Sequence, residues 1–351
     1  NKTMSVHKTN RGTWLASVRY TTWDGQRKQK KKEGFKTKRE AQAWEQEFLK
    51  KASGECDMKL GSMAELYMQD CASRLRPTTL ETKRSVIDTH ILPRLKDMPI
   101  NEITPAVVRN WQNELIASGL ADTYLKTINT QLSAIFNYAI KYYNIPYNPV
   151  ARCGTIGKKK SDDFQMWTLD EFKKFYACLK RPHSKMAFEL LFWTGLRVGE
   201  VLALCYNDFD MENKRVSVTK TYARLKGEDI FLPPKTPKSE RSVPVPDFVL
   251  EHLKDFVSRL YEYEPDERLF PFTKATLTHE MINTCKVAGI TPIKIHGLRH
   301  SYASMLIEQG CAPLLVSELL GHESVSTTLE IYSHLYPNKH DEVLKKLESL
   351  K

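Results

Sequence analysis

The sequence predicts a multidomain α+β protein: a small β-sheet with one helix, then a helical domain, then a mainly helical domain that carries a second small β-sheet. Three patterns support this class. Apolar and polar residues alternate near the N-terminus, helical periodicity fills the middle of the chain, and short strand-like segments interrupt the helices of the last part. With 351 residues, of which 41% are apolar, the chain is long enough to bury more than one core.

The composition limits the class of protein further. No apolar run approaches the ~18 residues of a membrane span, and no apolar leader resembles a signal peptide, so we expect a soluble protein of the cytoplasm with no membrane partner. The seven cysteines are scattered without a C-x-x-C pair. We therefore expect reduced thiols, with neither a disulfide framework nor a zinc site.

The N-terminal segment, residues 1–53, carries most of the positive charge. The chain has a formal net charge of +11, and this segment contains 14 Lys or Arg against 5 Asp or Glu. Trp14–Tyr20 alternates as a strand does, and Trp23–Gln26 supplies a turn. Arg27–Lys32 then forms a second, basic strand, and Thr37 caps a helix. A solvated lysine face would give the same charge, but tryptophans in alternating register favour a folded module that presents basic strands to nucleic acid. Its candidate DNA contacts are Arg19, Arg27, Lys28 and Lys30.

A helical domain is expected over residues 59–150, followed by a linker over residues 151–165. Helical periodicity runs through four segments: Ser62–Ala72, Thr78–Ile91, Thr104–Ser118 and Ala121–Tyr143. Boundaries are expected between them, at Pro77, Pro93, Pro105 and Gly119. Asn148-Pro149 is expected to end the last helix. These helices alone carry no chemical motif.

The last domain is expected over residues 166–338. Thr168 and Glu171 form a capping box that begins one helix, and Ser184–Trp193 forms the next. Three segments are predicted as strands: Arg215–Tyr222, Glu228–Leu232 and Arg241–Pro246. Helices resume after them. A C-terminal helix, residues 339–351, has one apolar face, made of Val343, Leu344, Leu347 and Leu350.

The segment TGLRVGE places an arginine where an anion is favoured. Gly195 ends one helix and Arg197 begins the next, so the guanidinium lies at a helix N-terminus, whose dipole opposes a cation and attracts an anion. A bound phosphate would reconcile the two. Glu200, three residues on, lies on the same helical face and is placed to hold the guanidinium. The pattern also fits an ordinary structural Arg–Glu pair.

A second group of polar residues follows about a hundred residues later. His296 and Arg299 lie at the start of a helix and project from one face. Gly321 stops the next helix, so His322 is presented on a sharp turn, and Tyr332 follows on a short helix. Two arginine forks that meet on one phosphate can stabilise a pentacoordinate transition state. A phenol with a pKa of about 10 needs such cations to act as a nucleophile.

In this order, TGLRVGE, HGLRH, LLGH and IYSH resemble the active-site motifs of tyrosine recombinases, and the whole chain resembles an integrase of the phage or conjugative-transposon type. The resemblance implies the tyrosine recombinase fold and a DNA transesterification through a 3′-phosphotyrosyl intermediate, which integrates and excises a mobile element in a bacterial host cell. It implies Tyr332 as the nucleophile, with Tyr336 as a poorer match. The residues implied to act with it are Arg197, His296, Arg299 and His322, with Glu200 in support. No cofactor is expected, in line with the absence of a G-x-x-x-x-G-K-[ST] loop.

The resemblance also implies a general acid. In the family, a lysine on a β-hairpin protonates the departing 5′-oxygen, and PPKTPKSERSVPV matches that hairpin with Lys235. Lys238 is the alternative. Lys220 and Lys226 lie on neighbouring strands and fit phosphate contacts or solvated charge better.

The other domains share the resemblance. Residues 1–53 resemble the arm-type DNA-binding domain of such integrases, and RPTTLETKRSVIDTHILPRL resembles their core-binding domain, which clamps the duplex. Its candidate phosphate contacts are Arg76, Thr78, Thr79, Lys83 and Lys126. The implied partners are double-stranded DNA at core and arm sites, the other subunits of a homotetramer, an excisionase and a DNA-bending protein. The C-terminal helix is expected to dock on a neighbouring protomer or in cis, and the sequence leaves the two open.

Other interpretations stay open at this point. A chromosome-dimer resolvase would share the motifs but lack the basic aromatic module, and a type IB topoisomerase would use similar residues on one duplex. A catalytically silent DNA-binding regulator on this fold would not need the complete set of motif residues. A metal nuclease around Asp208 and Asp210 is disfavoured, because two carboxylates in a loop are more often turn formers.

Overall fold

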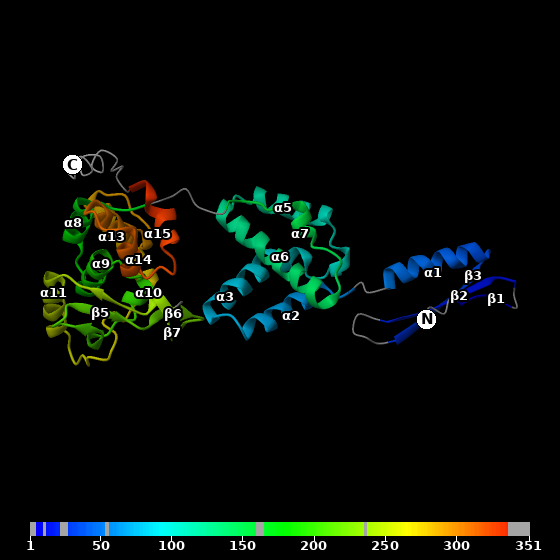
Figure 1. Ribbon diagram of the computed structural model, residues 1–351, viewed down its shortest axis with the longest axis horizontal. Helices are drawn as coiled ribbons and strands as arrows, with labels where there is room; N and C mark the ends of the chain where they lie inside the picture. Colours follow the sequence, from blue (N-terminus) through cyan, green and yellow to red (C-terminus); the bar gives the residue numbers. More distant parts are fainter. Residues whose placement is uncertain are drawn as a thin grey trace, which may run out of the picture. The chain divides into compact units, whose positions relative to one another are not determined.

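A computed structural model describes residues 5–9, 12–21, 27–52, 56–158, 165–234 and 237–335. The chain divides into two compact units, Asn1–Asp162 and Asp163–Lys351 (Figure 1). Among the described helices, none is both long and apolar enough to cross a membrane. All seven cysteines are free thiols, as expected, and four of them are buried.

The N-terminal module is a three-stranded antiparallel sheet covered by one helix (Figure 1). Its elements are β1 (Ser5–Lys8), β2 (Trp14–Thr21), β3 (Arg27–Phe35) and α1 (Lys38–Ala52). The predicted strands and helix are confirmed, β1 was not predicted, and the predicted turn at Trp23–Gln26 lies outside the described residues. Thr37 Oγ1 accepts a hydrogen bond from the backbone N–H of Glu40, which caps α1 as expected. Ala16, Val18 and Ala41 fill the small core between sheet and helix.

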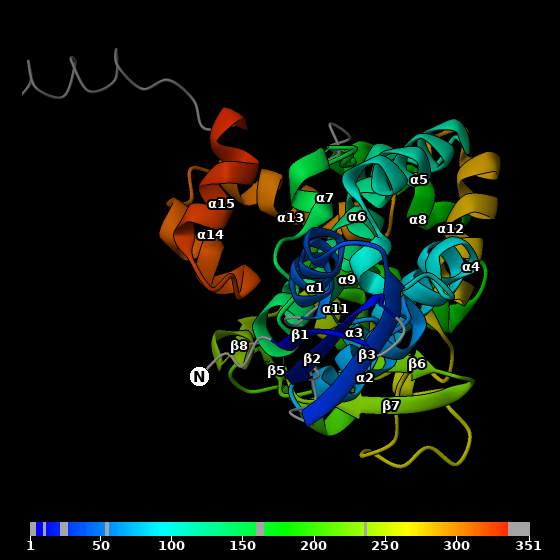
Figure 2. The ribbon, with the colours of Figure 1, turned by 90° about the vertical axis from the view of Figure 1, so that its right-hand side faces the viewer.

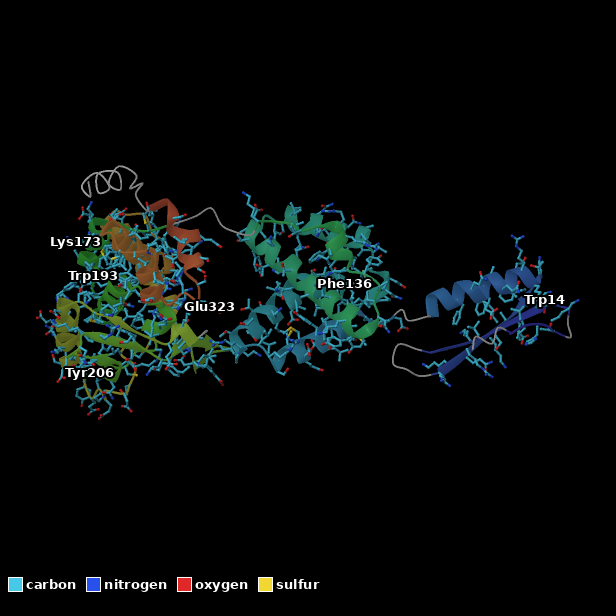
Figure 3. All side chains as sticks on the ribbon, viewed as in Figure 1. Trp14, Phe136, Lys173, Trp193, Tyr206 and Glu323 are labelled. Atoms are coloured by element: carbon cyan, nitrogen blue, oxygen red, sulfur yellow. The ribbon has the colours of Figure 1, made fainter. Side chains whose placement is uncertain are left out.

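The rest of the first unit is helical and packs around Phe136, which is labelled in Figure 3. Its elements are α2 (Leu60–Ala72), α3 (Pro77–Val86), the π-helical turn η1 (Ile87–Ile91), α4 (Leu92–Leu95), the 3₁₀ turn η2 (Ile100–Glu102), α5 (Pro105–Ala117), α6 (Asp122–Tyr143) and α7 (Pro149–Cys153). The four predicted helices are confirmed. Most of their ends lie within two residues of the predicted positions.

The boundary predicted at Pro93 is wrong, because the helix continues through it. Proline lacks the N–H of a regular helix, and its ring would clash with the carbonyl group four residues earlier. Here η1 widens the helix to a π turn just before Pro93, and the backbone N–H of Leu92 donates to the carbonyl oxygen of Ile87, five residues back. The wider turn makes room for the ring, so α3, η1 and α4 form one continuous helical run.

The end of the helical domain also differs from the expectation. The helix α6 stops at Tyr143, where Asn144 adopts a left-handed conformation. Asn148 does not end that helix but begins α7, since its side chain accepts hydrogen bonds from two backbone N–H groups of the first turn. Ile156, expected in the linker, packs in the core of the helical domain with 5% of its surface exposed.

The second unit combines helices with two small antiparallel sheets. Its helices are α8 (Leu169–Cys178), α9 (Pro182–Thr194), α10 (Val198–Val201), α11 (Asp247–Ser258), α12 (Lys274–Ala288), α13 (His296–Glu308), α14 (Pro313–Leu320) and α15 (Val325–Tyr332), with 3₁₀ turns η3 (Tyr206–Asp208), η4 (Pro237–Ser239) and η5 (Ser333–Leu335). Its strands are β4 (Phe209–Asp210), β5 (Arg215–Val218), β6 (Thr221–Leu225), β7 (Glu228–Leu232) and β8 (Arg241–Pro244). The capping box of Thr168 and Glu171 is confirmed.

The strand predicted over Arg215–Tyr222 is divided between the two sheets. β5 lies between β4 and β8, whereas β6 pairs only with β7. Most of the apolar side chains form one large core around α9. A smaller cluster holds α13, α14 and α15 together, and Figures 1 and 2 show these three helices side by side.

Replacing Ile156 by alanine tests the assignment of this residue to the helical domain. Because the side chain is buried, Ile156→Ala should lower the free energy of unfolding by about 2 to 5 kcal/mol. The exposed neighbour Thr155 supplies the control, and Thr155→Ala should change it by less than about 0.5 kcal/mol. The measurement is urea denaturation of the full chain with hydrogen exchange read in α5 and α6. Equal midpoints for the two variants would place Ile156 in the linker.

Candidate active site

The turn between α9 and α10 positions Arg197. Gly195 ends α9 with a φ of 62°, and a Cβ atom there would lie 2.3 Å from the Tyr302 ring, so glycine is needed for both the conformation and the close approach. Glu200 accepts hydrogen bonds from the backbone N–H of Arg197 at 2.9 Å and from its Nη1 at 2.8 Å. The predicted pair therefore exists. The Arg197 side chain keeps 36% of its surface exposed, whereas that of Glu200 keeps 5%.

A second arginine, Arg241, shares the same carboxylate. It follows η4 at the start of β8, and its Nη1 and Nη2 atoms donate to the two oxygens of Glu200 at 3.2 and 3.0 Å. Only 8% of this side chain is exposed. Burial alone would raise the pKa of Glu200, but the hydrogen bonds and charges of Arg241 and Arg197 outweigh it and hold the pKa below its ordinary value. Glu200 is therefore ionised at neutral pH.

Three arginines from different segments hold three successive carbonyl groups at the C-terminal end of α14. The last carbonyl groups of a helix have no partner within it, and the helix dipole makes that end favourable for cations. The three hydrogen bonds join Arg241 Nε to Leu319 O at 3.0 Å, Arg299 Nη2 to Leu320 O, and Arg197 Nη2 to Gly321 O at 3.2 Å. The end of α14 thus gathers three guanidinium groups, two of which, those of Arg197 and Arg241, form ion pairs with the buried carboxylate of Glu200.

Arg299 is the buried member of this group. It projects from the first turn of α13 with 2% of the residue exposed, and its Nη1 donates to the carbonyl oxygen of Gly195 at 2.9 Å. Burial, with the nearby charge of Arg197, lowers the pKa of Arg299 to about 9, so the guanidinium stays charged at neutral pH. The two arginines predicted to act together are therefore neighbours.

His296 and His322 belong to the same cluster. His322 follows the left-handed Gly321 on the predicted sharp turn, and its Nδ1 lies 2.8 Å from Thr328 Oγ1. Burial, together with the charges of neighbouring groups that include Arg299 and Arg197, lowers the pKa of each imidazole to about 4. Although His296 keeps part of its surface exposed, both histidines are neutral at neutral pH in the protein without DNA.

Tyr332 ends α15 and is almost completely buried, with 1% exposed. Its hydroxyl oxygen lies 2.7 Å from Nδ1 of His300, and the two rings meet at 61°. Burial raises the pKa of Tyr332 to about 12, against the opposing charge of Arg299. The phenol is therefore protonated in this state.

Sequence reasoning missed Arg241 and His300. Arg241 is 41 residues from Glu200 and reaches it through the pairing of β8 with β5, for which the sequence gives no signal. For His300 a signal existed, because a residue four positions after His296 lies on the same helical face.

The lysine candidates are only partly described. Lys235, Tyr336 and the C-terminal helix lie outside the described residues. Lys238 Nζ donates to the carbonyl oxygen of Glu323, the residue after His322 and labelled in Figure 3, at 3.0 Å.

The remaining charged candidates of the second unit have structural roles. Lys220 forms an ion pair with Asp208 at 3.3 Å, and Lys226 lies in the turn between β6 and β7 with a φ of 51°. Asp208 accepts from the backbone of Cys205, and Asp210 accepts from the turn that follows it, as expected of turn formers. Among the described residues, none of the acidic, histidine and cysteine side chains group as metal ligands.

The candidate DNA contacts of the first unit lie on two surfaces. On the sheet, Arg19, Arg27, Lys28 and Lys30 are all exposed. On the helical domain, a depression between α3 and α6 is lined in part by Thr78, Thr79 and Lys83. Lys83 is half-buried and donates to Tyr67 Oη and Gln131 Oε1, both at 2.8 Å, so it already has partners in the protein. The remaining candidates, Arg76 before α3 and Lys126 on α6, are partly buried.

Family models match most of the chain. An arm DNA-binding domain matches residues 4–52, a phage integrase N-terminal SAM-like domain matches residues 59–116, and the phage integrase family domain matches residues 165–339. Among the relatives, the ICEBs1 integrase of Bacillus subtilis is 31% identical over 82% of each chain. A XerC-like tyrosine recombinase of Caldanaerobacter subterraneus is 30% identical over 90% of each.

Solved structures of integrases share the fold. The Tn1549 transposon integrase in complex with a circular intermediate DNA matches 84% of this chain and all of its own, with a TM-score of 0.71 at 18% identity. A lambda integrase tetramer bound to a Holliday junction matches 92% of this chain and 96% of its own, with a TM-score of 0.60 at 23% identity. The predicted fold class is thereby confirmed. The chain belongs to the phage integrase family and is a tyrosine-type site-specific DNA recombinase.

Replacing Arg241 tests how far the site depends on the buried ion pair. Arg241→Ala should lower the free energy of unfolding at pH 7 by about 3 kcal/mol, the low end for breaking a buried pair, because Arg197 still neutralises Glu200. The folded-state pKa of Glu200 is depressed, so this stabilisation is present above the unfolded carboxyl pKa of about 4.3 and is lost as the pH falls through the folded value.

The difference between wild type and Arg241→Ala should therefore shrink in urea denaturation below pH 4. Arg215, exposed on the neighbouring strand β5, supplies the control. Arg215→Ala should change the stability by less than about 0.5 kcal/mol at either pH. A loss of stability for Arg241→Ala that does not depend on pH would contradict the role given to Glu200.

Proposed function

We propose that this protein integrates and excises a mobile DNA element, and that Tyr332 attacks a DNA phosphorus to form a 3′-phosphotyrosyl intermediate. One observation supports this most strongly: Arg197, Arg241 and Arg299 meet at the end of α14, and Arg197 and Arg241 share the buried carboxylate of Glu200. Three guanidinium groups and one carboxylate leave an excess of positive charge. A phosphodiester is the anion that DNA supplies at such a place.

In this proposal Arg197 and Arg299 bind the scissile phosphate. Arg197 is open to solvent and can exchange the Gly321 carbonyl for a phosphate oxygen, whereas Arg299 is held by Gly195 and Leu320. Guanidinium groups fixed before the reaction stabilise the charge that develops in the pentacoordinate transition state. Glu200 and Arg241 do not contact DNA in this scheme and position Arg197.

Binding of the phosphate changes the state of the two histidines. The phosphate charge opposes the arginines, which lower the pKa of His296 and His322, so the pKa of both rises when DNA binds. In either protonation state each imidazole has at least one N–H, which can donate to a non-bridging oxygen.

The reaction exchanges one phosphodiester for another. The Tyr332 oxygen forms a bond to phosphorus, the bond from phosphorus to the 5′-oxygen breaks, and Lys235 gives that oxygen a proton. Lys238, bound to the Glu323 carbonyl beside His322, is the alternative donor. Because the ester bond to the protein keeps the energy of the broken bond, rejoining needs no nucleotide cofactor.

We assign the domains accordingly. Residues 1–53 bind arm sites, residues 59–150 bind the core site, residues 166–338 carry the chemistry, and residues 339–351 form a helix that docks on a neighbouring protomer or in cis. DNA complexes of the Tn1549 and lambda integrases, the latter including a tetramer, support double-stranded DNA as partner and a homotetramer as the active assembly. An excisionase and a DNA-bending protein would set the direction of recombination in the cytoplasm of the bacterial host.

Replacing the nucleophile tests the chemistry directly. Tyr332→Phe should bind a nicked core site as tightly as the wild type but form no covalent adduct, because the ring is kept and the attacking oxygen is lost. The measurement is a denaturing gel with peptide mapping of the adduct, using a site from the ends of the element. A wild-type protein that binds without an adduct would favour the silent-regulator alternative, and an adduct of the phenylalanine variant would exclude Tyr332. An assay of strand exchange between two DNA sites distinguishes a recombinase from a topoisomerase.

The basic strand β3 gives a separate prediction. Replacing Lys28 and Lys30 by glutamine should weaken arm-site binding and reduce the slope of log K against log salt by about two, since each lysine lost removes one phosphate contact. Lys173 and Lys174, exposed on α8, supply the matched control, and glutamine there should leave arm binding unchanged. An unchanged slope for the β3 variant would contradict the arm-binding role.

A further inference from the structure

We infer that His300 accepts the proton of the Tyr332 hydroxyl during strand cleavage and is a further catalytic residue of this protein. The inference rests on the proposed role of Tyr332 as nucleophile. It begins from the hydrogen bond of 2.7 Å between His300 Nδ1 and the phenol oxygen, the atom that would attack the DNA.

The contact is built by two packed elements. His300 lies in the second turn of α13, and Tyr332 ends α15, which the small apolar cluster of α13, α14 and α15 holds in place. The phenol is 1% exposed, so bulk water does not reach it to take the proton. A proton acceptor must lie within about 2.6 to 3.2 Å of the group it deprotonates, and Nδ1 meets that condition.

The electrostatic surroundings leave His300 unprotonated in the free protein, so a ring nitrogen keeps a lone pair with which to accept a proton. Among the described residues, the charged and titratable groups that face it include Arg299 and His296 on its own helix and Tyr332 on α15. Burial, with the charge of Arg299, lowers the pKa of His300 to about 4, so the imidazole is neutral at neutral pH. The proton therefore rests on the phenol in the free protein and moves only as the phosphorus–oxygen bond forms.

The step balances without a further reactant. The O–H bond of Tyr332 breaks as an N–H bond forms at His300 Nδ1, and the phenol oxygen bonds to phosphorus. The bond from phosphorus to the 5′-oxygen breaks, and the proposed lysine acid protonates that oxygen. When the strand is rejoined, the His300 imidazolium returns its proton to the Tyr332 oxygen.

In this scheme the two histidines of HGLRH have different roles. His296 and His300 lie edge to face, with ring centroids 5.0 Å apart. After burial, the charges of His300, Arg299 and Arg197 lower the pKa of His296, whereas Nδ1 of His300 lies within hydrogen-bond distance of the phenol oxygen. One histidine serves the phosphate and the other serves the nucleophile. The structural alternative is that His300 only satisfies a buried hydroxyl group.

The variant His300→Asn separates these two roles. The asparagine Oδ1 takes the place of Nδ1 and accepts a hydrogen bond, but it does not take a proton at neutral pH. In single-turnover cleavage of the nicked site, we expect the rate to fall about 10²- to 10⁴-fold, with DNA binding and thermal unfolding unchanged. A wild-type rate would overturn the inference.

An altered tyrosine and an altered DNA site show which proton transfer is impaired in His300→Asn. A fluorinated tyrosine at position 332, whose phenol ionises at lower pH, should recover much of the rate lost in His300→Asn. A DNA site with a sulfur atom in place of the 5′-oxygen should rescue Lys235→Ala and not His300→Asn, because a thiol with a pKa of about 8.5 leaves without protonation. Rescue of His300→Asn by the sulfur substrate alone would overturn the inference.

The helical domain contains a matched control. His90 Nε2 lies 3.1 Å from Tyr124 Oη, a histidine–tyrosine pair with no place in the proposed chemistry. His90→Gln keeps an acceptor at that position and should cleave at the wild-type rate. If His90→Gln slowed cleavage as much as His300→Asn, the effect would be structural and the inference would fail.

One measurement uses only the wild-type protein, so its result does not depend on whether a variant folds. In the full-length wild type with ¹⁵N-labelled histidine, Nδ1 of His300 should show the chemical shift of an unprotonated, hydrogen-bonded nitrogen at pH 7, and a protonated Nδ1 would overturn the inference. The outcome is separable from that of the proposed function. Absence of a wild-type adduct at Tyr332 refutes the function, whereas a normal adduct with undiminished His300→Asn cleavage refutes only the role of His300.

Discussion

The site depends on one buried carboxylate. Glu200 binds Arg197 through both backbone and side chain and binds Arg241 through two hydrogen bonds. A buried carboxylate is stable only when its charge is compensated, and here two arginines from distant segments provide the compensation. Since the same arginines hold the last carbonyl groups of α14, Glu200 fixes three segments relative to one another. The phosphate-binding geometry follows from that constraint.

The same accumulation of positive charge sets the protonation states around it. Burial and the arginines hold the pKa of His296 and His322 near 4, whereas a DNA phosphate acts in the opposite direction. Each neutral imidazole has one N–H to donate before DNA arrives, and a bound phosphate favours the charged form, which has two. Without DNA, neutral imidazoles add no charge to the three arginines, so the electrostatic repulsion in the site is lower than it would be with charged imidazoles. With DNA, the phosphate supplies the compensating negative charge.

The sequence predicted helix ends, which depend on nearby residues, and missed contacts between residues that are far apart in the chain. Gly195 and Gly321 mark helix ends whatever the tertiary structure, so the positions of Arg197 and His322 followed from them. The partnership of Arg241 with Glu200 depends on strand pairing 41 residues away and has no local signature. The break predicted at Pro93 was wrong because the local signal of proline does not reveal the π turn that lets the helix continue through it.

The burial of Tyr332 has a mechanistic consequence. Under the proposed function, a phenol that is 1% exposed must be uncovered before it can meet a DNA phosphorus. α15 has two buried residues and packs in a small cluster that is separate from the main core of the second unit. Proton transfer to His300 requires this residue to stay within hydrogen-bond reach of the phenol while the oxygen meets the phosphorus, so α15 and the contact must move together. In this proposal the buried tyrosine is protected from reaction until DNA binding uncovers it.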